Sequence, residues 1–202
     1  MANIYIISAP SGTGKSSLIE NLIAKDSAIR KSISVTTRQP RLGEQNGLHY
    51  VFTNEEDFQT RLKNGEFLEY ARVHGNLYGT SKNLVDKELE KENDLILEID
   101  YQGAQVVRDH YPLSISIFIL PPNKALLRSR LEKRNTDDIA TIEQRLEAAS
   151  NEISHISEYQ YVIINDNFDT ALEDLVAIIR TSRLAAQNQE TESIITDFLK
   201  GN

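Results

Sequence analysis

The most constraining feature of the sequence is a glycine-rich segment near its start. The segment consists of Ala9, Pro10, Ser11, Gly12, Thr13, Gly14, Lys15 and Ser16. It follows a short β-branched run, residues 3–8, and precedes a helical pattern, residues 16–24, so a strand, a tight turn and a helix are predicted in that order. Backbone N–H groups in such a turn point into one concavity, where the helix N-terminus adds positive potential and phosphates bind. We expect Lys15 to reach the β- and γ-phosphates of a nucleoside triphosphate, and Ser16 to ligate Mg²⁺.

This phosphate loop departs from the pattern GxxxxGK[ST] at one position, because Ala9 stands where the first glycine is usual. Alanine fits there if the backbone dihedrals are ordinary, so we interpret it as a tolerated variant. A glycine-rich turn without a ligand is the alternative, and the strand–helix context argues against it. The loop alone predicts a nucleoside triphosphate and leaves the reaction open.

Strand-like and helix-like hydrophobic periods alternate along the chain of 202 residues. Apolar runs at residues 95–99, 115–120 and 162–164 are typical of strands buried on both faces, and a further strand is predicted at residues 33–37. We therefore predict an α/β fold with a parallel sheet covered by helices on both faces. The stretch from residue 38 to residue 80 breaks the alternation and indicates a small inserted β-rich subdomain.

Composition excludes other classes of protein. The net charge of −8 disfavours a nucleic-acid binder, and the absence of cysteine excludes disulfides and thiolate zinc sites. Apolar runs are too short to span a bilayer, and no basic leader precedes them, so we expect a cytoplasmic protein without a membrane partner. Four scattered histidines, none at metal-ligand spacing, are interpreted as structural or surface residues: His49, His74, His110 and His155.

Three further clusters carry charged or hydroxyl side chains. The first places Arg38 and Arg41 on a proline-stiffened turn, where they can clamp a second phosphate or form a solvated basic loop. The second joins Glu69 to the segment YGTS at residues 78–81. The third is an acidic strand end containing Asp100, from which a carboxylate can orient Mg²⁺ and its waters.

Residues 124–145 carry six basic and four acidic side chains, so this stretch has a charge of +2 within a protein of −8. Arg130 and Arg134 are four residues apart and share a helical face. By itself the stretch fits a solvated, salt-bridged helix. Beside a phosphate loop it predicts a lid whose arginines close over a transferring phosphoryl group.

Taken together, these segments resemble guanylate kinases, a family of P-loop nucleoside monophosphate kinases. The matching strings run from about residue 4 to about residue 184: SAPSGTGKSSL, TTRQPRLGEQNGLHY, EFLEYARVHGNLYGTS, LILEIDYQGA, IFILPP, RLEKR and IIND. The resemblance implies a P-loop NTPase-type fold in a single domain, residues 1–202. Its parts would be a core (about 1–33, 81–123 and 158–202), a GMP-binding insert (about 34–80) and a helical lid (about 124–157).

The resemblance also implies a role for each matching side chain. The GMP phosphate would be held by Arg38, Arg41, Tyr50 and Tyr78. The guanine edge would be read by Ser34, Glu69, Thr80 and Asp100. Two lid arginines, Arg130 and Arg145, would act with Lys15 and Arg38 in catalysis, and Arg134 would bind ATP. Asn165 and Asp166 either line the adenine pocket or cap a turn.

The implied reaction is Mg²⁺-dependent transfer of the ATP γ-phosphoryl group to GMP, and to dGMP, giving ADP and GDP. Guanine chemistry agrees with this, because its N1–H and N2–H₂ donors suit a carboxylate, whereas adenine has an acceptor at N1. An amphipathic C-terminal tail could pack on its own domain or on a second subunit of a homo-oligomer; its apolar residues are Ile194, Ile195, Phe198 and Leu199.

Three other functions are less consistent with the sequence. A GTPase would share the DxxG string at residues 100–103, but its N-K-x-D string is missing after Asn123. An interaction domain that has lost catalysis would be expected to lose Lys15, the loop glycines or the lid arginines, which are all present. A kinase of this fold acting on another small phosphate would not need both Glu69 and Asp100.

Overall fold

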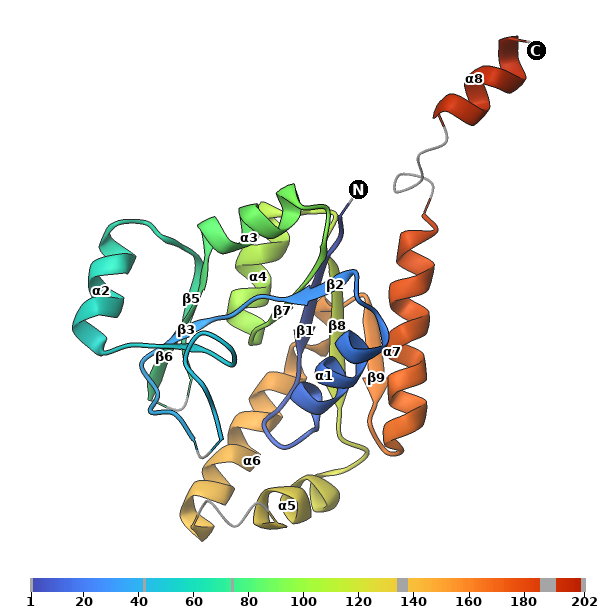
Figure 1. Ribbon diagram of the computed structural model, residues 1–202. Helices are drawn as coiled ribbons and strands as arrows, with labels where there is room; N and C mark the ends of the chain where they lie inside the picture. The colour runs from blue at the N-terminus through green and yellow to red at the C-terminus, as the bar shows by residue number, and fades with distance from the viewer. Residues whose placement is uncertain (1, 42, 74, 134–137, 186–191, 201–202) are drawn as a thin grey trace.

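The computed structural model describes residues 2–41, 43–73, 75–133, 138–185 and 192–200 (Figure 1). Within these residues, a five-stranded sheet has the order β2-β7-β1-β8-β9, and each neighbouring pair is parallel. The strands are β1 (Ile4–Ser8), β2 (Ile29–Lys31), β7 (Asp94–Glu98), β8 (Ile115–Leu120) and β9 (Tyr161–Ile164). The predicted parallel sheet is therefore confirmed.

Helices cover both faces of this sheet, as its continuously apolar strands predict. One face packs on α1 (Lys15–Lys25) and α7 (Phe168–Arg183), which share a buried cluster with Tyr5 and Ile7 of β1. The other face packs on α3 (Lys82–Glu90) and α4 (Tyr101–His110), beneath the alternate β1 side chains. The side chains of β1 point to the two faces in turn, so a strand buried on both sides joins two separate apolar clusters.

The strand predicted at residues 33–37 is wrong in its bounds. Strand β2 ends before that stretch, at Lys31, and within it β3 spans only Val35–Thr36, in a different sheet. Strand β2 lies at the edge of the parallel sheet, where Arg30 is exposed, so it lacks the apolar run that identifies a central strand. The chain therefore passes from one sheet to the other within three residues.

A second sheet of described residues, with the order β4-β3-β6-β5, forms the insert. Its elements are β3, β4 (Val51–Phe52), α2 (Glu55–Lys63), β5 (Phe67–Val73) and β6 (Asn76–Ser81). Helix α2 begins after Asn54, because the Asn54 side chain accepts a hydrogen bond from the Asp57 N–H at 2.8 Å and so caps the first turn. A separate small core fills the insert, with the Phe58 and Phe67 rings stacked at 4.5 Å between centroids.

Helices α5 (Lys124–Lys133) and α6 (Ile139–Ser154) form a third body beside the phosphate loop (Figure 1). They share their own apolar cluster, and a 3₁₀ turn, η1 (Ile156–Glu158), follows α6. The last helix, α8 (Glu192–Lys200), stands apart from the rest of the molecule in Figure 1, and its Phe198 is 84% exposed. No helix of the described residues has the length and apolar character needed to cross a membrane.

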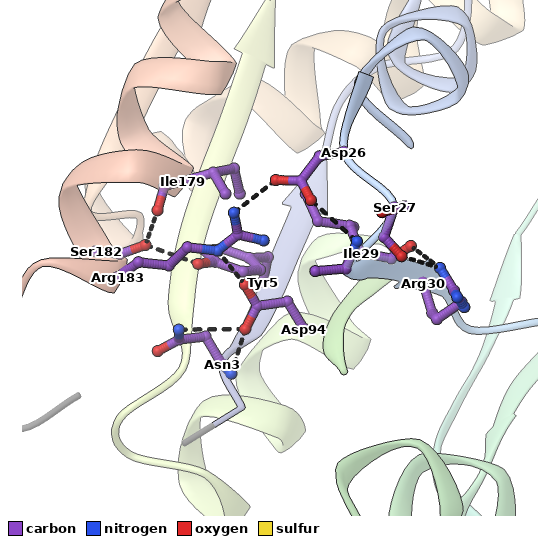
Figure 2. A network of polar contacts seen from close by, with 11 residues as sticks. Asn3, Tyr5, Asp26, Ser27, Ile29, Arg30, Asp94, Ile179, Ser182 and Arg183 are labelled. Atoms are coloured by element: carbon purple, nitrogen blue, oxygen red, sulfur yellow. Dashed lines mark hydrogen bonds and ion pairs between the residues drawn. The ribbon is translucent and has the colours of Figure 1, made fainter. Parts of the chain in front are cut away.

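A polar network closes the end of the parallel sheet where its strands begin (Figure 2). Arg183 of α7 donates to Asp94 of β7 at 2.6 Å and to Asp26 after α1 at 2.5 Å. Asp94 also accepts from the Asn3 backbone N–H at 2.8 Å, although its side chain is only 7% exposed. This network therefore joins the C-terminal ends of α1 and α7 to the start of β7 and to the residue that precedes β1, at the opposite end of the strands from the phosphate loop.

Candidate active site

The phosphate loop connects β1 to α1 as predicted. Gly12 and Gly14 have φ values of 92° and 96°, a left-handed conformation that strains any other residue. Ala9 is not among the residues of this kind, since the one non-glycine with positive φ in the described chain is Glu92. Ala9 therefore does not adopt the backbone conformation that would require glycine, and its tolerance in the phosphate loop stays a prediction.

Contacts from distant elements hold the loop in place. The Thr13 hydroxyl donates to the Pro10 carbonyl at 2.7 Å, and the Asn165 side-chain amide donates to the Thr13 carbonyl at 2.7 Å. Arg130 of α5 donates to the same Thr13 carbonyl at 3.2 Å and to the Asn165 carbonyl at 2.9 Å. Asn165 is thus a support of the loop, which neither of its two sequence interpretations anticipated.

Glu98 lies at the centre of the charges beside the loop. Its Oε1 accepts from the Ser16 hydroxyl at 2.7 Å and lies 3.9 Å from the Lys15 Nζ, while its Oε2 forms an ion pair with Lys31. Burial alone would raise the pKa of Glu98, but the ammonium groups of Lys15 and Lys31 and the hydrogen bonds outweigh it, so the pKa falls to about 2. Glu98 is therefore an ionised carboxylate at neutral pH.

Sequence reasoning chose Asp100 for this position, two residues away. The Asp100 side chain accepts a hydrogen bond from the Gly103 N–H at 2.9 Å and so caps α4. Asp100 and Glu98 both line the same cavity. A signal for Glu98 was available, because it is the last residue of a buried strand and points to the end where the phosphate loop lies. Lys31 carried no such signal, since its contact with Glu98 spans two strands that are far apart in sequence.

Three of the four residues expected to read guanine line the cavity, and the fourth, Thr80, is hydrogen-bonded to one of them, Glu69. Glu69 of β5 is 5% exposed, and its Oε1 accepts a hydrogen bond from the fully buried Thr80 hydroxyl of β6. Burial raises the pKa of Glu69 to about 7; the Thr80 hydrogen bond opposes this and the charge of Asp100 adds to it. Ser34 lies on the cavity wall as well.

The residues expected to hold a second phosphate divide into two groups. Arg41, Tyr50 and Tyr78 line the cavity, and the two tyrosine rings meet edge to face with centroids 6.0 Å apart. Arg38 instead donates twice to Glu44, at 2.8 and 2.9 Å, and its guanidinium carbon lies 5.3 Å from the Tyr50 ring centroid. The structure thus pairs Arg38 with a carboxylate beside the cavity wall.

One cavity of ≈ 370 Å³ lies between the phosphate loop and the insert. The phosphate loop and Glu98 line it on one side, and residues of the insert, including Glu69 and Tyr78, line it on the other. Helix α6 contributes Asn151 and Glu152 to its wall. Burial raises the pKa of Glu152 to about 7, which Lys15 opposes and Asp100 reinforces. The phosphate loop and the buried carboxyl group of Glu69 therefore line one cavity.

The predicted lid arginines lie against the phosphate loop. Arg145 of α6 donates to the Ser11 hydroxyl at 3.3 Å, and Arg130 reaches the loop through Thr13. Both guanidinium groups therefore stand beside the place where the triphosphate is expected. Arg134, predicted to bind ATP, lies outside the described residues.

Comparison with known proteins agrees with this geometry. The family model for guanylate kinase matches residues 1–182. The guanylate kinase of Thiobacillus denitrificans is 52% identical over 186 residues, which cover 92% of this chain and 89% of that protein. That of Vibrio parahaemolyticus is 50% identical over 188 residues, covering 92% and 91%. The crystal structure of guanylate kinase from Anaplasma phagocytophilum superposes with a TM-score of 0.79 at 33% identity, covering 97% of this chain and 94% of that one. A phosphate loop and a buried acidic corner on one cavity, together with these matches, show that the chain belongs to the guanylate kinase family.

Proposed function

We propose that this chain uses the residues described above to transfer the γ-phosphoryl group of ATP to the phosphate of GMP, and of dGMP, giving ADP and GDP. The reaction itself is supported by membership of the family and by guanylate kinases that are 50% and 52% identical to this chain. The observation that carries the assignment of residues is the shared cavity, which the phosphate loop and Glu69 line from opposite sides. A nucleoside triphosphate and a purine monophosphate can meet there with their phosphates adjacent.

The donor would bind on the phosphate loop, with its β- and γ-phosphates facing the loop N–H groups and the Lys15 ammonium. That ammonium lies 3.9 Å from Glu98. Arg130 and Arg145 already stand against the loop through Thr13 and Ser11. The loop therefore needs little rearrangement before ATP arrives, and Arg134 would complete this side.

The acceptor would bind on the insert. Guanine N1–H and N2–H₂ would donate to Glu69, with Asp100, Ser34 and Thr80 completing the recognition of the base. The GMP phosphate would lie against Arg41, Tyr50 and Tyr78, which share the cavity wall. Arg38 would exchange its partner Glu44 for phosphate oxygens, because both groups offer it a pair of anionic oxygen acceptors.

An acceptor phosphate oxygen is an anion at neutral pH, so the transfer needs no general base. The obstacle is repulsion between two polyanions, and charge spreads over the γ-phosphoryl oxygens in the loose transition state. Lys15, Arg130 and Arg145 would neutralise that charge from the donor side, and Arg38 from the acceptor side. Closure of the lid would also exclude water, which would otherwise accept the phosphoryl group.

We assign Mg²⁺ to this site as the partner of ATP. Among the described residues, no cluster of three histidine, cysteine or carboxylate side chains could hold a metal on its own, which fits an ion held chiefly by substrate phosphates. The Ser16 hydroxyl and the Glu98 carboxylate are hydrogen-bonded at 2.7 Å beside the loop and supply suitable hard oxygen donors, with Asp100 nearby on the cavity wall. When bound, the ion would offset phosphate charge.

We further propose the division into core, insert and lid at the boundaries given above. Separate apolar clusters in the insert and in the α5–α6 pair support it, because each body has its own small core. Association through the C-terminal helix is a second proposal of this kind. Its support is the exposure of Phe198 and Leu199, at 84% and 82%. A cytoplasmic location remains a prediction from the sequence.

An ADP-release assay with MgATP and a single acceptor tests the function. GMP, AMP and UMP should be compared with a reaction that lacks an acceptor. We expect rapid turnover with GMP and background rates with the other three. ADP release that needs no acceptor would indicate a hydrolase instead, and turnover with AMP equal to that with GMP would remove Glu69 from base recognition.

A further inference from the structure

Gly103 occupies a position where its backbone does not require glycine. It lies buried in the first turn of α4, where alanine is the better helix former, and it is not one of the glycines with positive φ. There is no room for a side chain at this position: a Cβ atom built on Gly103 would clash with Glu69 Oε2 and would lie 2.9 Å from Glu69 Cδ. The need for glycine therefore comes from a side chain of another element.

We propose that Gly103 is a specificity-determining positioning residue for GMP, because its missing side chain leaves the space in which the Glu69 carboxylate lies. Its N–H at the same time donates to Asp100 at 2.9 Å, so this one residue touches both carboxylates of the guanine corner. The inference rests on the proposed function, since it concerns the residues assigned there to base recognition.

The surrounding contacts decide what would move if a methyl group were added. Helix α4 cannot retreat easily, because Ala104 and Val107 are fully buried in the core beneath the parallel sheet. The β5 backbone is held as well, since Glu69 pairs with Thr80 in the β5–β6 ladder, which continues in register to Val73 beyond the irregularity between Phe67 and Glu69. The Glu69 carboxylate is the end of a flexible side chain, so it is the group that gives way. A Gly103→Ala protein therefore keeps its fold and loses the position of the carboxylate.

Gly103→Ala should raise KM for GMP on the order of 10- to 100-fold, because the base then meets a displaced acceptor. KM for ATP should stay within about twofold, since the phosphate loop lies across the cavity. The midpoint of thermal unfolding should not fall. Gln105→Ala is the matched control, because it places an alanine on the exposed side of the same helix. We expect this variant to have wild-type KM values for GMP and ATP. A KM for GMP that stays at the wild-type value in Gly103→Ala overturns the proposal.

A double variant separates this contact from a general effect on structure. Glu69→Asp shortens the side chain by one methylene, so its carboxylate no longer reaches the added methyl group. In the Glu69→Asp background, Gly103→Ala should therefore raise KM for GMP by less than about threefold. In the wild-type background the same substitution should raise it by at least about tenfold. Equal losses in the two backgrounds would contradict the contact and overturn the proposal.

Two further measurements make every outcome informative. If Glu69→Gln leaves KM for GMP unchanged, the assigned function of Glu69 fails and this inference fails with it. If Glu69→Gln raises it but Gly103→Ala does not, the function stands and the inference alone is wrong. Should Gly103→Ala not fold, it is repeated in Glu69→Ala, where the clash is absent. Folding there supports the contact, and failure to fold there overturns it.

Discussion

The two ends of the parallel sheet carry similar charged groups, but at one end they are paired with each other and at the other they line a cavity. Where the strands begin, Arg183 is paired with Asp94 and Asp26 (Figure 2). Where they end, Lys15 lies 3.9 Å from Glu98, and the cavity opens beside it. Strand β7 contributes to both, because Asp94 is its first residue and Glu98 its last. One end is closed by its own ion pairs, whereas the other offers its charges to a ligand.

Burial of a charged side chain does not by itself reveal its role, whereas the groups that bind it do. Asp94 and Glu98 have side chains equally little exposed, 7% each. Asp94 is bound by a guanidinium and a backbone N–H, which anchor helices to strands. Glu98 is bound by two flexible ammonium groups and a hydroxyl, which a nucleotide and its ion can engage in turn. Removing a charge should therefore affect stability at the first end and turnover at the second.

Lys15→Ala should have the largest effect. We expect kcat to fall on the order of 10³- to 10⁵-fold, because the loop then lacks its cation at the transferring phosphoryl group. Calorimetry should still detect GMP binding of near wild-type affinity, and thermal unfolding should change little, since Lys31 remains beside Glu98. Lys25→Ala, on the exposed end of the same helix, is the control. Near-normal kcat in Lys15→Ala would refute the assignment of the donor site.

Arg183→Met should show the opposite pattern at the other end. Loss of the guanidinium leaves the buried Asp94 charge uncompensated, which costs about 3–5 kcal/mol of unfolding free energy. Below its unfolding transition the variant should keep wild-type kcat. Urea unfolding combined with the ADP-release assay measures both. Arg180→Met, exposed on the same helix, should be neutral in both measurements. A large loss of kcat in folded Arg183→Met would join the two ends functionally and break the comparison.

Glu69→Gln should increase the free energy of unfolding and weaken GMP binding. The folded-state pKa of Glu69 is about 7, above its ordinary value of 4.5, so the folded protein binds the extra proton between these values and its stability falls as pH rises through them. The glutamine variant avoids this loss, and we expect it to gain up to about 3 kcal/mol over the wild type at pH 8 and little at pH 4. Denaturant unfolding at the two pH values measures the difference.

GMP affinity should move the other way. In the wild type it should rise between pH 6 and pH 8 as the Glu69 proton leaves, because guanine donors need the ionised carboxylate. Part of that rise comes from ionisation of the GMP phosphate, and Glu69→Gln keeps this part alone. An identical pH dependence of GMP affinity in both proteins would contradict the proposed recognition.

Asp26→Asn should have the smallest effect. The hydrogen bond from Arg183 lowers the pKa of Asp26, so its contribution to stability is present above its ordinary pKa and is lost as pH falls through the lower, folded-state value. Because the group is largely solvated, we expect less than about 1 kcal/mol at pH 7. The difference in unfolding free energy between wild type and variant should shrink toward pH 3. A loss as large as that of Arg183→Met would make the outer carboxylate as important as the buried one.

Sequence reasoning succeeded where a feature is local. The phosphate loop lies within eight consecutive residues, and the parallel sheet follows from short apolar runs, so both were predictable. Strand β6 was not predicted, because its segment YGTS was singled out for its side chains and not as a strand. The structure gives a reason for its glycine: a Cβ on Gly79 would lie 2.8 Å from the Phe67 ring. The strand carries glycine because an aromatic ring of its neighbour packs over it.

Contacts between distant segments could not be predicted. Lys31 and Glu98 meet because β2 and β7 are neighbours in the sheet, and Arg183 reaches Asp94 because α7 ends beside the start of β7. The pairing of Arg38 with Glu44 is close in sequence, yet it depends on the path of an irregular turn. Sequence reasoning therefore identified residue types near the cavity more reliably than their partners.

The contact between the phosphate loop and helix α5 has a consequence for the thermodynamics of nucleotide binding. A Cβ on Gly12 would lie 2.8 Å from Leu131, so the helix rests directly on the loop. A loop held in this way has given up its conformational freedom during folding, and ATP binding need not order it again. The heat capacity change of ATP binding should therefore report the surface that the nucleotide buries, without a contribution from a loop that folds around it.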